Sequence, residues 1–189
     1  MSFGVLAIQG DVREHIQALQ RLGVEAVAVR TAEEVAAVEG LIIPGGESTT
    51  IGKLMKRYGL LEPIRELAAS GRPLFGTCAG AILMARTIDH AAADQPALEL
   101  MDIVVERNAF GRQVDSFEAD VEVKGVPGGP VRAVFIRAPV IAAARDGVEV
   151  LARHEDRIVA ARQGNLLAVS FHPELTDDSR MHEYFIRMR

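Results

Sequence analysis

The chain contains a single cysteine, Cys78, and small residues flank it in the stretch "GTCAG" at 76–80. This stretch matches the nucleophile-elbow pattern, in which a strand turns sharply into a helix and presents a nucleophile. The positions two before and two after the nucleophile pass close together in that turn, so they must be small. The helix N-terminus favours a thiolate, and the amide of Ala79 points to where an oxyanion would form. We therefore predict an exposed, nucleophilic Cys78. A small cysteine buried in a tight strand–helix corner is the structural alternative.

A nucleophilic thiol needs a base, and the base needs a group that orients it. His172 and Glu174 stand in "FHPE" at the end of an apolar strand, where residues two apart project to the same side. We expect His172 to take the thiol proton and Glu174 to hold the imidazole. His-Pro at a strand end is otherwise typical of a turn, so this motif gains its meaning from Cys78. The other histidines are expected at the surface: His15, His90, His154 and His182. No HxxxH or CxxC spacing occurs, so no metal site is predicted.

A glycine pair forms the third candidate feature, in "LIIPGGESTTIG" at 41–52. Gly45 and Gly46 follow a predicted strand and permit backbone conformations closed to other residues. The spacing of a phosphate-binding loop is absent, although a plain turn before a helix remains an alternative. We expect an amide of this turn to serve as the second oxyanion donor, opposite Ala79.

The elements that must position these residues alternate between strands and helices in the first half of the chain. The expected strands span 3–8, 24–29, 40–44 and 73–76, and the expected helices span 11–23, 49–59, 61–71 and 79–87. Asp11 is expected to cap the first helix. The second half has consecutive strands, including a hairpin around Gln163-Gly164, and a closing helix at 180–189. We predict one α/β domain over 1–189, with an open, mixed and largely parallel sheet flanked by helices.

Composition excludes several classes of function. The chain has 189 residues, a net charge of -5 and one cysteine. This charge favours neither nucleic acid nor an anionic membrane, and no apolar run approaches the roughly 20 residues that span a bilayer. One cysteine forms no internal disulfide, and the first residues lack a signal-peptide pattern, so a cytoplasmic location is expected.

Three motifs, "PGGES", "GTCAG" and "HPE", occur in the order found in class I (triad) glutamine amidotransferases, and the chain resembles that flavodoxin-like superfamily. Five further stretches narrow the resemblance to the glutaminase subunits of pyridoxal 5'-phosphate synthase: residues 6–15, 43–50, 105–118, 134–139 and 171–178. The similarity spans essentially the whole chain. Ala81 departs from the pattern, because relatives often carry a larger apolar residue there.

The resemblance implies hydrolysis of L-glutamine to glutamate and ammonia by a triad of Cys78, His172 and Glu174. It places the oxyanion hole at Gly46 and Ala79, and Gln9 near the partner and that hole. The implied substrate-binding positions are Gly46, Glu47, Ser48, Arg107, Ile136 and Arg137. An arginine suits the α-carboxylate of glutamine, and Glu47 suits its ammonium group.

The resemblance also implies a partner, the synthase subunit, which receives the ammonia and forms a dodecameric core decorated by glutaminase subunits. Pyridoxal 5'-phosphate is then a product of the complex, and this chain binds no cofactor. Related glutaminases are poorly active alone, because the oxyanion hole is incomplete until the partner docks. Two alternatives stay open: a glutaminase subunit of another pathway, which should lack "RNAFGRQ" at 107–113, and a non-catalytic interaction module on the same fold.

Overall fold

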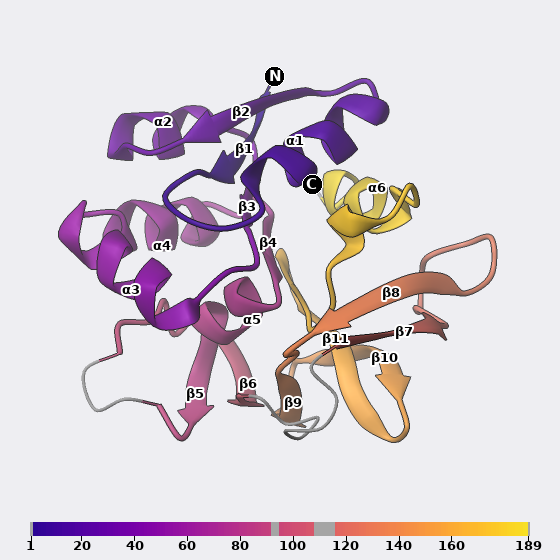
Figure 1. The fold of residues 1–189 in the computed structure, drawn as a ribbon. Coiled ribbons are helices and arrows are strands. Elements are labelled where there is room, and N and C mark those ends of the chain that lie inside the picture. The colour runs from indigo at the N-terminus through magenta and orange to yellow at the C-terminus, as the bar shows by residue number, and fades with distance from the viewer. Residues whose placement is uncertain (1, 92–94, 108–115, 189) are drawn as a thin grey trace.

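The computed structural model describes residues 2–91, 95–107 and 116–188. Within these ranges, ten strands form one curled sheet, and two more form a separate ribbon (Figure 1). The parallel part of the sheet runs in the order β2 (Glu25–Val29), β1 (Ser2–Leu6), β3 (Leu41–Ile43), β4 (Leu74–Thr77) and β12 (Leu166–Val169). Beyond β12, the sheet continues with mixed pairing through β11 (Arg157–Gln163), β9 (Val140–Ala144), β6 (Met101–Glu106) and β5 (Ala85–Asp89). The strand β10 (Glu149–His154) also pairs with β11. The ribbon joins β7 (Ser116–Val121) to β8 (Val131–Ile136).

Helices cover both faces of the parallel part (Figure 1). One face carries α2 (Ala32–Ala37), α3 (Ser48–Arg57) and α4 (Leu61–Ala69), and the other carries α1 (Val12–Arg21) and α6 (Arg180–Ile186). The short helix α5 (Ala79–Met84) follows β4, and the 3₁₀ turn η1 (Pro173–Leu175) follows β12. No described helix is long and apolar enough to cross a membrane.

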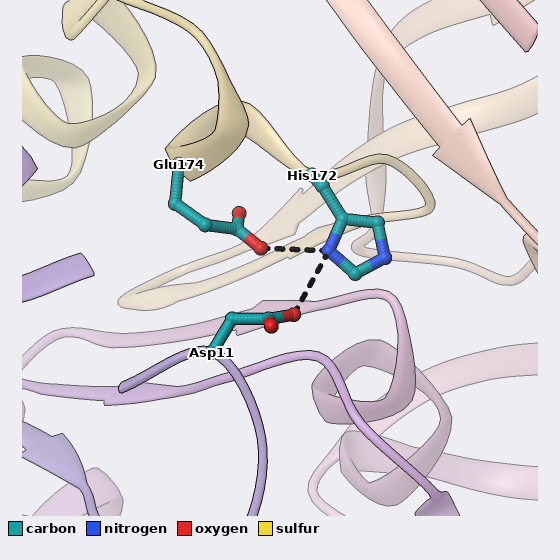
Figure 2. A group of neighbouring side chains, drawn as sticks. All are labelled: Asp11, His172 and Glu174. Atoms are coloured by element: carbon teal, nitrogen blue, oxygen red, sulfur yellow. Dashed lines mark hydrogen bonds and ion pairs between the residues drawn. The ribbon is translucent and has the colours of Figure 1, made fainter. Parts of the chain in front are cut away.

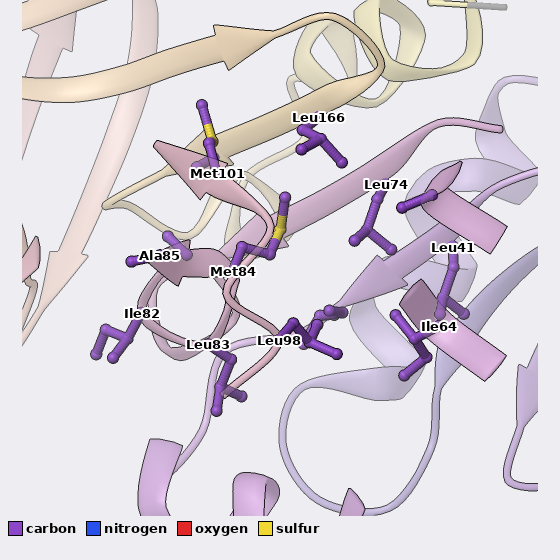
Figure 3. Packing of buried hydrophobic residues seen from close by; sticks show 14 of the residues in the cluster. Leu41, Ile64, Leu74, Ile82, Leu83, Met84, Ala85, Leu98, Met101 and Leu166 are labelled. Atoms are coloured by element: carbon purple, nitrogen blue, oxygen red, sulfur yellow. The ribbon is translucent and has the colours of Figure 1, made fainter. Parts of the chain in front are cut away.

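The period-2 alternation of the central strands divides the buried side chains between the two faces. On β4, Leu74 packs into the cluster beneath α3 and α4, whereas Phe75 packs into the cluster beneath α1 and α6. On β12, Leu166 and Leu167 divide in the same way. Figure 3 shows the first cluster, in which side chains of α4 and α5 pack against residues of β3, β4, β5, β6 and β12. These strands are thus apolar on both faces, as a covered parallel sheet requires.

The predicted elements are largely confirmed, including the hairpin between β11 and β12 and the closing helix. Two local expectations are wrong. The helix after Cys78 ends at Met84 and not at 87, because Ala85 adopts extended backbone and begins β5, which pairs with β6. Asp11 precedes α1 but makes no side-chain capping hydrogen bond. Its carboxylate lies instead in the site described below.

Parallel pairing also explains where chemistry can gather. The strands β1, β3, β4 and β12 are parallel neighbours, so their carboxyl ends meet at one edge of the sheet. Gln9 follows β1, Gly45 follows β3, Cys78 follows β4 and His172 follows β12. Open α/β sheets bind ligands at this edge.

Candidate active site

Cys78 occupies a sharp turn between β4 and α5, with φ 48° and ψ -103°, an uncommon conformation for a residue other than glycine. A Cβ atom on Gly76 would lie 2.6 Å from the carbonyl carbon of Gly80. A Cβ atom on Gly80 would lie 2.1 Å from the carbonyl oxygen of Ile43. Both flanking positions therefore require glycine, which is the steric condition that the elbow pattern predicts.

The thiol of Cys78 is less exposed than predicted, at 7% for the whole residue. It lies on the wall of a cavity of about 460 Å³, which gives it access to a small substrate. Its Sγ atom lies 3.9 Å from the carbonyl oxygen of Ile136, and it lines the same cavity as His172, whose pKa it helps to raise. Burial alone fits the alternative of a packed corner, but the cavity and the histidine fit a nucleophile.

His172 and Glu174 form a short buried hydrogen bond, 2.6 Å between Nδ1 and Oε1. The residues do not lie on a strand as expected: β12 ends at Val169, and Glu174 belongs to the turn η1. Pro173 favours such a turn, because its fixed φ suits the first helical position. The backbone N–H of His172 donates to the carbonyl of Val134 on β8, which anchors the histidine.

A second carboxylate, that of Asp11, approaches the same nitrogen at 3.4 Å. Figure 2 shows both carboxylates on the Nδ1 side of the ring, with Nε2 on the opposite side. Burial alone would lower the pKa of His172. Hydrogen bonds to Asp11, Cys78 and Glu174 outweigh burial and raise this pKa to about 12. Burial raises the pKa of Glu174, and the hydrogen bond from His172 opposes that rise. The imidazole is thus held in its charged form.

Ligand atoms of Asp11, His172 and Glu174 lie within 4.8 Å of one another. Such a group has the donor chemistry to hold a metal ion. The separation of 2.6 Å between Nδ1 and Oε1 is that of a direct hydrogen bond, and it leaves no room for an ion between these two atoms. The geometry favours hydrogen bonding over coordination, and the absence of a metal stays a prediction.

The glycine turn packs against both Gln9 and His172. A Cβ atom on Gly45 would lie 2.4 Å from Cε1 of His172, and one on Gly46 would lie 2.4 Å from Oε1 of Gln9. The backbone N–H of Glu47 donates to the same Gln9 oxygen at 2.9 Å. Gln9 thus holds the turn in place. Of the predicted oxyanion donors, Gly46 and Ala79 both line the cavity beside Cys78.

All six predicted substrate-binding residues line this cavity: Gly46, Glu47, Ser48, Arg107, Ile136 and Arg137. Glu47 Oε1 lies 3.6 Å from Nη2 of Arg107, and Nη1 of Arg107 donates to Oε1 of Gln95 at 3.1 Å. Glu47 also accepts from the backbone N–H groups of Thr49 and Thr50, which caps α3. The predicted substrate-binding residues therefore place one carboxylate and two arginines in the cavity that contains the thiol.

The sequence prediction missed several residues of the site. Asp11, Ile82 and Leu175 line the cavity, and Gln95 contacts Arg107. Asp11 carried a usable signal, since it comes shortly after the first strand at the ligand-binding edge. Of the stretch 107–113, only Arg107 lies among the described residues.

The expectation of surface histidines is wrong for His15 and His182, which are both 0% exposed. His90 is exposed as expected, and His154 is half-buried beside Phe117 and Phe135. His15 lies on α1 and His182 on α6, and their helices bring them together behind Glu174.

The fold and the cavity define a class: α/β proteins that present a cysteine at a nucleophile elbow beside a histidine–carboxylate pair. A family model described as the SNO glutamine amidotransferase family matches residues 5–189. The chain belongs to this SNO glutamine amidotransferase family. The resemblance inferred from the motifs is thereby confirmed.

Individual relatives match this chain in sequence over nearly the full length of both proteins. The protein named pyridoxal 5'-phosphate synthase subunit PdxT from Geobacillus kaustophilus is 57% identical, covering 100% of this chain and 94% of the relative. The PdxT protein of Moorella thermoacetica is 58% identical, with coverages of 100% and 99%.

Solved structures agree on the fold. A structure titled glutamine amidotransferase has a TM-score of 0.93 and 55% identity, covering 98% of this chain and 97% of that one. PurLQS from Thermotoga maritima has a TM-score of 0.73 at 17% identity, with coverages of 98% and 96%, and shares the fold alone. The predicted amidotransferase-like α/β fold is confirmed.

Proposed function

We propose that this chain is a glutaminase subunit that hydrolyses L-glutamine to L-glutamate and ammonia and supplies the ammonia for the synthesis of pyridoxal 5'-phosphate. The observation that carries the proposal is the placement of Cys78 and of His172, which Glu174 holds, together on the wall of a substrate-sized cavity. Membership of a glutamine amidotransferase family and the names of its full-length relatives support this substrate and product.

The chemistry follows from the arrangement of the triad. The thiolate of Cys78 attacks the carboxamide carbon, and the resulting oxyanion is held by the amides of Ala79 and Gly46. Protonated His172 gives its proton to the departing ammonia, which leaves a thioester on Cys78. A water molecule, deprotonated by His172, then attacks the thioester and releases glutamate and the free thiol. Glu174 orients the imidazole and stabilises its charged form in both steps.

The rest of the cavity suits the amino-acid end of glutamine. Arg107 and Arg137 supply positive charge for the α-carboxylate, and Glu47 accepts from the α-ammonium group. Ser48 adds a hydroxyl, and the Ile136 side chain offers an apolar wall to the aliphatic part of the substrate. Glutamine is thus bound at one end by charge and presented to Cys78 at the other.

The partner in this proposal is a synthase subunit that consumes the ammonia, in a cytoplasmic complex with a dodecameric core. Gln9 and the glycine turn face that partner, and docking completes the oxyanion hole. Pyridoxal 5'-phosphate is the product of the complex, and the chain itself needs neither cofactor nor metal. The relatives' description as synthase subunits supports the partnership.

Glutamate release from L-glutamine, measured with and without the cognate synthase subunit, tests the proposal. Activity is expected with the partner, to be far lower without it, and to be lost in the Cys78→Ala variant, which should keep its melting temperature and its binding to the synthase. An assembled wild-type complex that releases no glutamate would contradict the proposal and favour a non-catalytic module. Equal turnover of the free subunit would contradict partner activation.

A further inference from the structure

We propose that His15 and His182 are positioning residues, which form a buried chain of hydrogen bonds that fixes Glu174 and thereby aims Nε2 of His172 at Cys78. This inference rests on the proposed function. It assigns a catalytic purpose to two histidines that lie outside the cavity lining and outside the triad.

The contacts form a continuous line from α6 to the nucleophile. Nε2 of His182 lies 2.9 Å from Nδ1 of His15. On the other side of its ring, His15 Nε2 lies 3.4 Å from Oε2 of Glu174 and 3.1 Å from the hydroxyl oxygen of Thr77. Glu174 uses its other oxygen, Oε1, for Nδ1 of His172. Because Thr77 directly precedes Cys78, the same imidazole contacts both arms of the site.

The partners available to Glu174 determine which ring nitrogens of His15 and His182 carry a proton. Among the described residues, Oε2 of Glu174 has no partner with full hydrogen-bond geometry, and Nε2 of His15 lies 3.4 Å from it. A buried carboxylate oxygen without a donor is costly. His15 therefore carries its proton on Nε2, and its Nδ1 accepts from the Nε2–H of His182. Nδ1 of His182 is then left as a bare lone pair, consistent with its lack of a partner among those residues.

The opposite pair of tautomers is worse on both counts. It would aim a lone pair of His15 at the carboxylate of Glu174, and it would bury an N–H of His182 that has no partner in the described part of the chain. Both imidazoles are neutral, which this one-proton scheme requires. Burial above all, and then electrostatic interaction with the imidazoles of His182 and His172, hold the pKa of His15 well below its usual value. Burial, and then Arg21, lower the pKa of His182 to about 3.

The consequence for catalysis is a fixed orientation of the His172 ring, with its proton donor toward Glu174. With the Nε2–H of His15 facing Oε2 at 3.4 Å, Glu174 keeps Oε1 on Nδ1 of His172, so that Nδ1 is the donor and Nε2 is left for the thiol. Outer hydrogen bonds of this kind set tautomer and ring orientation in other histidine sites, where their loss costs 10- to 100-fold. Asp11 contacts Nδ1 of His172 from the exposed side and is not part of the hydrogen-bond chain that runs through His15 and His182.

Three substitutions of His15 separate this role from simple packing. His15→Leu removes both nitrogens. His15→Gln places an amide N–H near the position of Nε2, whereas His15→Asn places one near Nδ1, out of reach of Glu174. With the synthase bound, we expect His15→Leu and His15→Asn to lower kcat about 10- to 100-fold with KM for glutamine within twofold. His15→Gln should restore most of kcat.

The single cysteine supplies a readout that does not depend on turnover. Alkylation of the full-length chain by iodoacetamide, followed by mass spectrometry across pH 5–10, reports Cys78 alone. His15→Leu and His15→Asn should shift the half-maximal rate to higher pH, because a poorly held imidazole stabilises the thiolate less. Among the described residues, the titratable groups that contact His172 or Glu174 besides Cys78 are Asp11 and His15, and Asp11 is unchanged in all these variants.

Phe75→Leu is the matched control. The Phe75 ring contacts both imidazoles, with ring centroids 6.5 Å from His15 and 5.9 Å from His182, but it has no polar atom. This variant should lower the melting temperature and leave kcat and the alkylation profile unchanged. Equal effects of Phe75→Leu and His15→Leu on kcat would overturn the proposal. So would a higher kcat for His15→Asn than for His15→Gln.

Two further outcomes are also informative. If His15→Leu fails to fold, the comparison of His15→Gln with His15→Asn alone tests the proposal. If the wild-type complex releases no glutamate, the proposed function fails, but the alkylation profiles still support or overturn the chain of hydrogen bonds.

Discussion

The two sides of the His172 ring face different surroundings. On the Nδ1 side, Glu174 is buried, and its contacts extend through His15 to His182 in the core. On the Nε2 side, the ring faces a cavity whose charged groups, Glu47 and Arg107, are partly exposed and pair with one another at 3.6 Å. Backbone sterics and burial therefore fix Cys78 and His172, whereas the charged side chains proposed to bind the substrate are partly exposed. Changes on the buried side should affect folding and kcat, and changes on the open side should affect KM.

The largest effect is expected from Gly80→Ala, on the buried side. The added Cβ would lie 2.1 Å from the backbone oxygen of Ile43, so β3 or α5 must shift. We expect a loss of at least about 3 kcal/mol in the free energy of unfolding, measured by urea denaturation. Gly59→Ala is the control: φ there is +66° and no atom lies within 4 Å, so only backbone strain of about 1–2 kcal/mol is expected. Equal losses would show that crowding at the elbow is not the constraint.

Glu174→Gln should have the next largest effect, on kcat. The amide can donate to Nδ1 of His172 and place the proton on Nε2, so that the histidine no longer accepts from Cys78. We expect kcat of the complex to fall about 10²- to 10⁴-fold while KM changes little. Asp11→Asn, which alters the longer contact of 3.4 Å, should cost much less. A reversal of the two effects would make Asp11, and not Glu174, the orienting carboxylate.

The buried pair also predicts how stability depends on pH. The pKa values of His172 and Glu174 are both raised on folding, so the folded chain retains protons that the unfolded chain has lost. The stabilisation from His172 is fully present below about pH 6.5 and is lost as pH rises toward 12. In a Cys78→Ala background, Asp11 and Glu174 still raise the pKa of His172, although the contribution of Cys78 is lost. The free energy of unfolding should therefore still fall between pH 7 and 9, by up to about 1.4 kcal/mol per unit.

The control for this pH effect is the same background with His172→Gln and Glu174→Gln, in which neither group titrates. Its free energy of unfolding should change less over pH 7–9, as followed by urea denaturation at each pH. Parallel curves for the two chains would mean that His172 is not held in its charged form.

The same contrast explains what could be predicted from the sequence. The elbow was predictable because Cys78 needs glycine at fixed spacing, and the strands were predictable because apolar runs alternate with amphipathic ones. Glu174 was found through its motif but placed on a strand, although His-Pro at a strand end is typical of a turn, and Pro173 begins such a turn here. His15 and His182 were missed because helix packing, and not local pattern, buries them. Long-range contacts of this kind leave no signal in a single sequence.

The smallest expected effect lies on the open side, at Arg107. Arg107→Met keeps the length of the side chain but removes its charge and its hydrogen bond to Gln95. If Arg107 binds the α-carboxylate of glutamine, KM should rise about 10- to 100-fold with kcat nearly unchanged, in steady-state assays of the complex. Arg86→Met is the matched control, since Arg86 pairs with Asp102 at 3.4 Å and lies outside the cavity lining. It should leave both constants unchanged. A fall in kcat for Arg107→Met without a rise in KM would mean that the open side also orients the reacting groups, and the division at His172 would then be wrong.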